Sequence, residues 1–97
     1  FTPSRPSAFM DLESVRAREG WTVQLIAGNQ EQTVLNLMDR YASVSGILYT
    51  YTQRQGQDWF VGFYGEFSSR DEARKAVERL PQALRDQSPW IRQSRDF

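Results

Sequence analysis

The segment Arg54–Phe67, RQGQDWFVGFYGEF, decides the fold because it joins a tight turn to a long run of strand-forming residues. Gly56 lies where a hairpin turn requires conformational freedom, and the alternation from Trp59 to Tyr64 predicts a strand. Large apolar side chains occupy both faces of this strand, with Trp59, Val61 and Phe63 on one face and Phe60, Gly62 and Tyr64 on the other. Since a core needs only one apolar face, we expect the second face to bind a ligand, with Gly62 leaving room at its middle.

Further strands are predicted on both sides of this hairpin. Trp21–Ala27 alternates so that Val23, Leu25 and Ala27 share one face, while Thr22, Gln24 and Ile26 share the other. The run Ile47–Thr52 is rich in β-branched and aromatic residues, and Pro89–Gln93 can form a short last strand with proline at its start. The sequence thus predicts four strands.

Two capping boxes predict the helices between these strands. Asn29 precedes Gln32 by three positions and begins a helix with an apolar stripe, and Ser69 precedes Glu72 in the same way. The resulting order, β-α-β-β-α-β, predicts an α+β fold in which a four-stranded antiparallel sheet has two helices on one face, the ferredoxin/RNP-like split βαβ arrangement. We expect the other face of the sheet to be uncovered, which suits an extended polymer.

A length of 97 residues supports one compact domain. Residues 1–19 are predicted as a linker with a possible short helix, in which Ser7 is the N-cap and Gly20 ends the helix after Glu19. Residues 20–97 are predicted as the domain. Because the chain starts at Phe1, we expect it to be part of a longer protein. Whether the first helix packs on the domain stays open.

Composition excludes several classes of function. The chain has 12 basic and 12 acidic residues, no histidine and no cysteine, so it offers no basic field for nucleic acid and lacks thiol nucleophiles and the usual zinc ligands. Between Trp21 and Phe67 two arginines face four acids, which predicts a slightly acidic sheet. No pair of carboxylates is forced to converge for glycoside hydrolysis. We expect no catalysis, no metal and no cofactor.

The predicted platform suits a neutral carbohydrate. Aromatic rings can stack on sugar rings, and the amide of Gln24 can donate to and accept from hydroxyl or N-acetyl groups. Trp59 is open to two interpretations, a ligand contact or a packing residue, and Gln24 can equally be a bystander in solvent. An RNA-recognition motif has the same order of elements, but this strand lacks its basic-aromatic signature and carries Asp58 and Glu66 at its ends.

Several motifs together resemble a SPOR (sporulation-related repeat) domain over about residues 20–93. They are Trp21–Leu25, the hairpin Gly56–Trp59, Val61–Phe63 leading to Gly65–Phe67, and Ser69–Ala73 with Ala76. The resemblance implies the fold predicted above. It also implies a non-enzymatic module that binds peptidoglycan glycan strands lacking stem peptides at the bacterial division septum. By the same resemblance, the module lies in the periplasm as the C-terminal part of an inner-membrane protein and touches no membrane itself.

The resemblance also implies a glycan site. Gln24 and Trp59 match positions in the family's glycan-binding region, whereas Ala27 and Asn29 stand where related domains carry small hydroxyl residues. Strand alternation adds Ile26, Phe60 and Tyr64 if Val61 and Phe63 point inward, and adds Tyr51 in one of two registers of its strand. Stem peptides are expected to be excluded because they do not fit the platform.

Two other functions stay open. A docking module for other cell-division proteins would use the same exposed aromatic residues and would bind its partner without glycan. An RNA-binding module would lose affinity steeply with added salt, whereas binding of a neutral sugar should barely respond.

Overall fold

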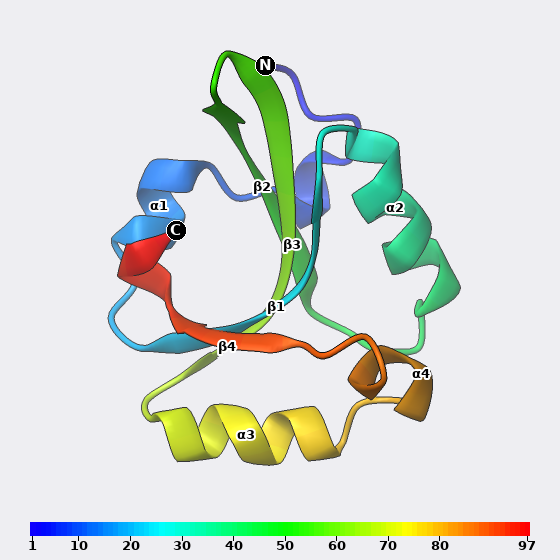
Figure 1. Ribbon diagram of the computed structural model, residues 1–97, viewed down its shortest axis with the longest axis vertical. Coiled ribbons are helices and arrows are strands. Elements are labelled where there is room, and N and C mark those ends of the chain that lie inside the picture. The colour runs from blue at the N-terminus through cyan, green and yellow to red at the C-terminus, as the bar shows by residue number, and fades with distance from the viewer.

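The computed structural model describes residues 1–97 and confirms the predicted fold class. Its antiparallel sheet has the strand order β2-β3-β1-β4. The strands are β1 (Trp21–Gly28), β2 (Ile47–Arg54), β3 (Gln57–Phe67) and β4 (Trp90–Gln93). The helices are α1 (Leu12–Arg16), α2 (Glu31–Arg40), α3 (Arg70–Glu78) and α4 (Gln82–Arg85), and two 3₁₀ turns are η1 (Pro6–Ala8) and η2 (Ser94–Asp96). Figure 1 shows this arrangement. No helix has both the length and the apolar character needed to cross a bilayer.

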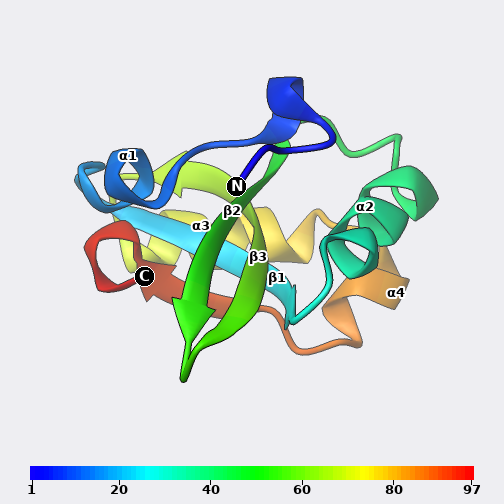
Figure 2. The same cartoon turned by 90° about the horizontal axis from the view of Figure 1, so that it is seen from above.

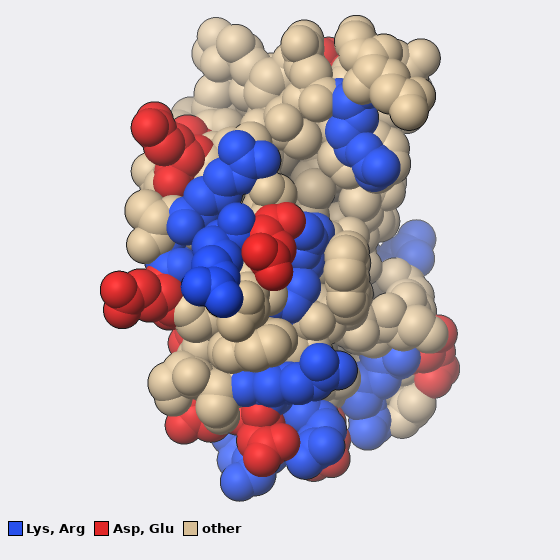
Figure 3. Space-filling model, turned by 60° about the vertical axis from the view of Figure 1, so that its left-hand side comes forward, with Lys and Arg blue, Asp and Glu red and all other residues tan.

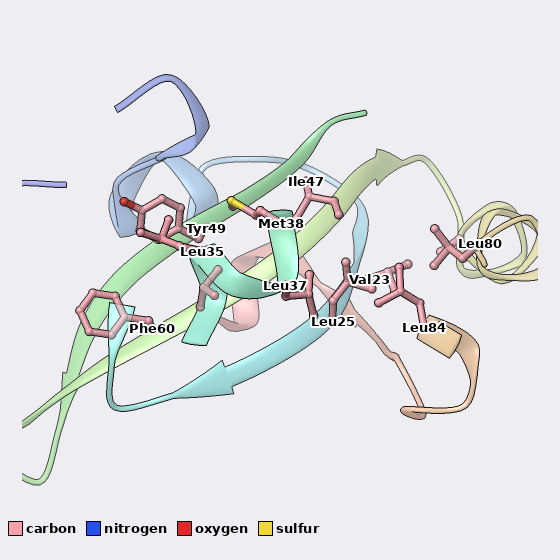
Figure 4. Packing of buried hydrophobic residues seen from close by; sticks show 12 residues of the cluster. Val23, Leu25, Leu35, Leu37, Met38, Ile47, Tyr49, Phe60, Leu80 and Leu84 are labelled. Atoms are coloured by element: carbon pink, nitrogen blue, oxygen red, sulfur yellow. The ribbon is translucent and has the colours of Figure 1, made fainter. Parts of the chain in front are cut away.

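One face of the sheet packs against α2, α3 and α4 and forms the core. The largest cluster of buried apolar side chains contains 12 residues from the sheet and these helices, including Val23, Tyr49 and Phe60 from three different strands (Figure 4). The predicted N-cap is present at the start of α3 but not at the start of α2. Ser69 caps α3 as predicted, because its hydroxyl accepts from the Glu72 N–H at 3.1 Å.

The predicted capping box at the start of α2 is wrong. Gln30, not Asn29, is the N-cap, and its side chain makes no capping hydrogen bond. Gln32 instead donates to Asn36 one turn further along the helix, at 2.8 Å. Asn29 is exposed in the bend that follows β1, so its amide is available to other partners.

A β-bulge in β1 reverses the predicted alternation of its side chains. Gln24 pairs with Phe63, but the next aligned pair is Ile26 with Gly62, so Leu25 is an extra residue on β1. Leu25 lies in the core cluster and Ile26 packs against it, so both side chains face the helices. As directly paired residues share a face, Gln24 lies on the same face as Phe63, opposite Ile26.

The prediction that Ile26, Phe60 and Tyr64 share a face with Gln24 is therefore wrong. Phe60 is 4% exposed within the core cluster, and Ile26 and Tyr64 pack against that cluster. Gly62 lies on this helix-covered face too, where a Cβ atom would be 3.0 Å from Ile26 Cγ2 and 3.1 Å from Val34 Cγ1. Gly62 makes room for α2, not for a ligand.

The opposite face of the sheet, which we call the groove face, is only partly uncovered. The helix α1 and the 3₁₀ turn η2 lie side by side over one end of the groove face, on the side of the molecule away from α2 (Figures 1 and 2). Val15 of α1 and Phe63 of β3 are fully buried, and the Phe97 ring lies 5.4 Å from the Phe63 ring. The prediction that this face of the sheet is uncovered is therefore wrong for the part under α1 and η2, where these two segments form a second, smaller apolar layer.

The segment before β1 packs on the domain. Its helix is shorter than predicted and begins with Asp11 as the N-cap, since the Asp11 carboxylate accepts from the N–H and hydroxyl of Ser14. Ser7 lies in η1 and caps no helix. Upstream, the Met10 N–H donates to the Tyr49 carbonyl at 2.9 Å, which fixes this segment along β2.

Candidate functional site

The uncovered part of the groove face is a groove of about 340 Å³. Its lining comes from five segments that are distant in the sequence: Leu12 and Arg16 of α1, Thr50, Thr52, Gln53 and Arg54 of β2, Trp59 and Val61 of β3, Trp90 and Arg92 of β4, and Phe97. The groove therefore exists only when the sheet, α1 and the C-terminal residues are assembled.

Strand pairing sets the floor of the groove. Thr50 pairs with Val61, and Thr52 pairs with Trp59, so these four side chains share the groove face. The Thr50 side chain is fully buried, and its hydroxyl has no hydrogen-bond partner. The floor combines short apolar and hydroxyl groups, which leaves the larger side chains to form the walls.

Two tryptophans flank the floor. Trp59 lies under the guanidinium of Arg54, whose central carbon is 4.8 Å from the ring centre. Trp90 is 56% exposed, and the guanidinium of Arg92 lies 4.3 Å from its ring. Each arginine holds its tryptophan in place through a cation–π contact. The groove thus presents two aromatic walls to a ligand.

Gln24 joins the groove through Arg92. The Gln24 side-chain oxygen accepts from Arg92 Nη1 at 2.8 Å, which leaves the Gln24 NH₂ group free to donate. Arg92 also donates to the backbone oxygen of Asp96 and lies over the Phe97 ring. Burial lowers the pKa of Arg92, an effect that Asp96 opposes, and a guanidinium stays charged at neutral pH. Gln24 orients a cation as well as offering an amide.

Of the residues predicted for the site, only Trp59 lines the groove. Gln24 and Ala27 lie on the same face of the sheet, and Gln24 is linked to the groove through Arg92. Asn29 is exposed just beyond the end of β1.

The other four predicted residues lie on the helix-covered face. Ile26 is there because of the β1 bulge, Phe60 and Tyr64 are there because Val61 and Phe63 point to the groove face, and Tyr51 is there because it pairs with Phe60. The Tyr51 ring stacks on Phe1 at 4.4 Å, and its hydroxyl donates to Asp58 at 2.8 Å. The sequence had left two registers open for the strand of Tyr51, and pairing selects the one that turns it away from the groove.

Sequence reasoning missed Trp90, Arg92, Phe97 and the arginines of the groove wall. The available signal was the tryptophan of Pro89-Trp90 at the start of a short predicted strand, and the structure leaves this side chain 56% exposed. The expected acidity is also wrong for the groove, because its 11 lining residues include three arginines and no acid. The count of charged residues between Trp21 and Phe67 omitted α1 and β4, which supply Arg16 and Arg92.

The groove contains none of the residues that acid–base or nucleophilic catalysis usually requires. No carboxylate, histidine or cysteine is among its lining residues. No group of His, Cys, Asp and Glu side chains in the structure is arranged to hold a metal ion. The arrangement is suited to binding through stacking, hydrogen bonds and positive charge.

Comparison with known proteins shows the family of the chain. The SPOR domain family model matches residues 17–93. The cell division protein DamX of Serratia marcescens is 31% identical over 81 residues, which cover 81% of this chain and 37% of that protein. The chain therefore spans well under half of this relative's length. Four features of the sequence narrow the family resemblance to DamX, and the comparison confirms it. They are the hairpin Gly56–Trp59, the run Glu72–Val77, the Leu80-Pro81 pair and Ser88–Trp90.

Proposed function

Because this chain belongs to the SPOR domain family, we propose that it is a non-catalytic module that binds the glycan strands of peptidoglycan and thereby recruits its parent protein. The observation that carries the proposal is the groove, which has tryptophan walls, a hydroxyl-bearing floor and an amide beside it. The absence of carboxylates from its lining supports a binding function rather than hydrolysis.

The contacts of the proposed glycan follow from sugar chemistry. The apolar faces of sugar rings stack on Trp59 and Trp90, and the Gln24 NH₂ group donates to a hydroxyl or N-acetyl oxygen. Asn29 adds a second amide at the end of β1, next to the small side chain of Ala27. Ile26, Tyr51, Phe60 and Tyr64 act indirectly, by fixing the sheet from the helix-covered side.

Glycan strands without stem peptides are the proposed ligand. The groove is bounded on one side by α1 and Phe97, and a peptide on each muramic residue would meet this wall. At the division septum, where such strands arise, the module would concentrate its parent protein on the periplasmic side of the inner membrane. The assignment of DamX as a cell division protein supports this location for a related module.

The test is a pull-down of the domain on purified sacculi before and after amidase treatment. We expect enrichment on treated sacculi, a strong loss with Trp59→Ala and Gln24→Ala, and no loss with Gln32→Ala, which removes an exposed glutamine from α2. Circular dichroism must show that each variant is folded. Binding that is equal on both preparations, or unaffected by all three substitutions, would refute the proposed site.

A protein-docking function is the alternative that a specific observation favours. Trp90 is 56% exposed although Arg92 lies over its ring, and exposed aromatic surface of this kind can mark a protein-interaction site. A cell-division protein that binds the domain in the absence of any glycan, and loses affinity with Trp90→Ala, would establish this alternative.

A further inference from the structure

Three arginines line the groove. Arg16, Arg54 and Arg92 come from α1, β2 and β4, and no acidic side chain shares the lining with them. The ion pairs in the structure join Arg5 to Asp39 and Arg74 to Asp71, so none involves these three. Figure 3 shows Lys and Arg side chains gathered on the side that carries α1 and the C-terminal end, with Asp and Glu side chains among them. In a chain of zero net charge, the groove lining thus carries three basic and no acidic side chains.

Backbone, amide and aromatic contacts hold these guanidinium groups in position. Arg16 donates to the backbone oxygen of Phe97 at 2.7 Å, Arg54 lies over Trp59, and Arg92 is fixed by Gln24 and by the rings of Trp90 and Phe97. The cation–π and amide contacts of Arg54 and Arg92 orient these cations without an ion pair. Asp58 accepts from the Tyr51 hydroxyl, and Asp96 contacts Arg92 through its backbone oxygen while its charge opposes the effect of burial on the pKa of Arg92.

Unsatisfied polar atoms lie at the same place. Arg92 Nε is buried without a hydrogen-bond partner, as is the hydroxyl of the fully buried Thr50 in the floor. Buried polar groups without partners are rare in folded proteins, but these two atoms are shielded from solvent and do not contact a ligand in the groove. Positive charge and oriented donors indicate a groove built for an anion-bearing ligand.

The chemistry of the proposed glycan supplies such an anion. Each muramic acid residue carries a lactyl group whose carboxyl forms a neutral amide with the stem peptide. Hydrolysis of that amide leaves a carboxylate on every muramic residue, whereas the sugar rings are unchanged. We propose that Arg54, Arg92 and Arg16 recognise the freed lactyl carboxylates, so the domain selects peptide-free strands by charge. This inference rests on the proposed glycan-binding function.

Charge recognition and steric exclusion make different predictions for one ligand. A peptide-free glycan whose lactyl carboxyls are converted to methylamides has no charge and no bulky peptide. Exclusion alone predicts that this neutral glycan binds as well as the carboxylate form. Charge recognition predicts about ten-fold weaker binding, because charge-assisted hydrogen bonds are lost.

The experiment measures the dissociation constants of both glycans by titration calorimetry at low and high salt. We expect salt to weaken binding of the carboxylate form and to leave the methylamide form almost unchanged. Arg54→Gln and Arg92→Gln should each weaken binding of the carboxylate form several-fold and affect the methylamide form much less. Arg79→Gln, which removes the same charge from an exposed position on the helix-covered side, should alter neither. Arg54 is exposed, so its variant tests the inference even if Arg92→Gln fails to fold.

The outcomes separate the inference from the function on which it rests. Equal affinity for the two glycans, with no effect of salt, would overturn charge recognition and leave glycan binding established. Binding to neither glycan would overturn both. Tighter binding to a single-stranded RNA oligonucleotide than to the carboxylate glycan would also overturn both, since the arginines would then serve phosphate groups.

Discussion

Gly62→Ala tests which face of the sheet packs on the helices. The added methyl group would lie 3.0 Å from Ile26 Cγ2 and 3.1 Å from Val34 Cγ1, well inside the separation of about 3.5–4.0 Å that two carbon atoms prefer. Both neighbours are β-branched and stiff, so they cannot turn away easily.

The magnitude follows from two opposing effects. Overpacking a core costs about 1–3 kcal/mol, and replacing glycine lowers the entropy of the unfolded chain, which offsets about 0.4–1 kcal/mol. We therefore expect a net destabilisation of about 1–2 kcal/mol, which lowers the melting temperature by roughly 5–10 °C in a domain of this size. Glycan affinity should not change, because Gly62 lies on the helix-covered face.

Differential scanning calorimetry and a glycan titration on the same variant provide the assay. Gly28→Ala is the matched control, since a Cβ atom there would meet Thr33 at an ordinary contact distance of 3.7 Å or more. Its melting temperature should stay the same or rise slightly. A Gly62→Ala protein with unchanged stability and weaker glycan binding would refute the assignment of faces and restore Gly62 to the groove.

Three further predictions concern stability. Val15→Ala should cost roughly 2 kcal/mol in urea denaturation, because Val15 is fully buried between α1 and the sheet; no change would mean that α1 is detached in solution. Ser69→Ala should cost about 1 kcal/mol through loss of the α3 cap, measured by thermal unfolding, and an unchanged melting temperature would contradict the cap. Burial and the bond to Glu31 raise the pKa of Tyr49 to about 12, so the stability this tyrosine contributes is complete below pH 10 and lost as pH rises through 12. Tyr49→Phe should flatten that loss in denaturation curves collected from pH 9 to 12, and parallel profiles for the two proteins would refute it.

The order of strands and helices could be predicted from the sequence because it depends on short-range signals. The hairpin glycine, the alternation in β3 and the Ser69 cap each act within a few residues. The family resemblance depends on the order and spacing of such motifs. These signals determined the α+β fold and placed Gln24 and Trp59 in one candidate site, where the structure also finds them on one face.

The faces of the strands could not be predicted, because a bulge is visible only in the pairing of two strands. One extra residue, Leu25, moves Ile26 to the helix-covered face and turns Ala27 toward the groove face. The groove itself depends on contacts across the whole chain: α1, β4 and Phe97 bring Arg16, Arg92 and an aromatic wall to the hairpin of Trp59. Local sequence determined which elements form, and tertiary packing alone decided which side chains meet and that a chain of zero net charge lines its groove with three basic and no acidic side chains.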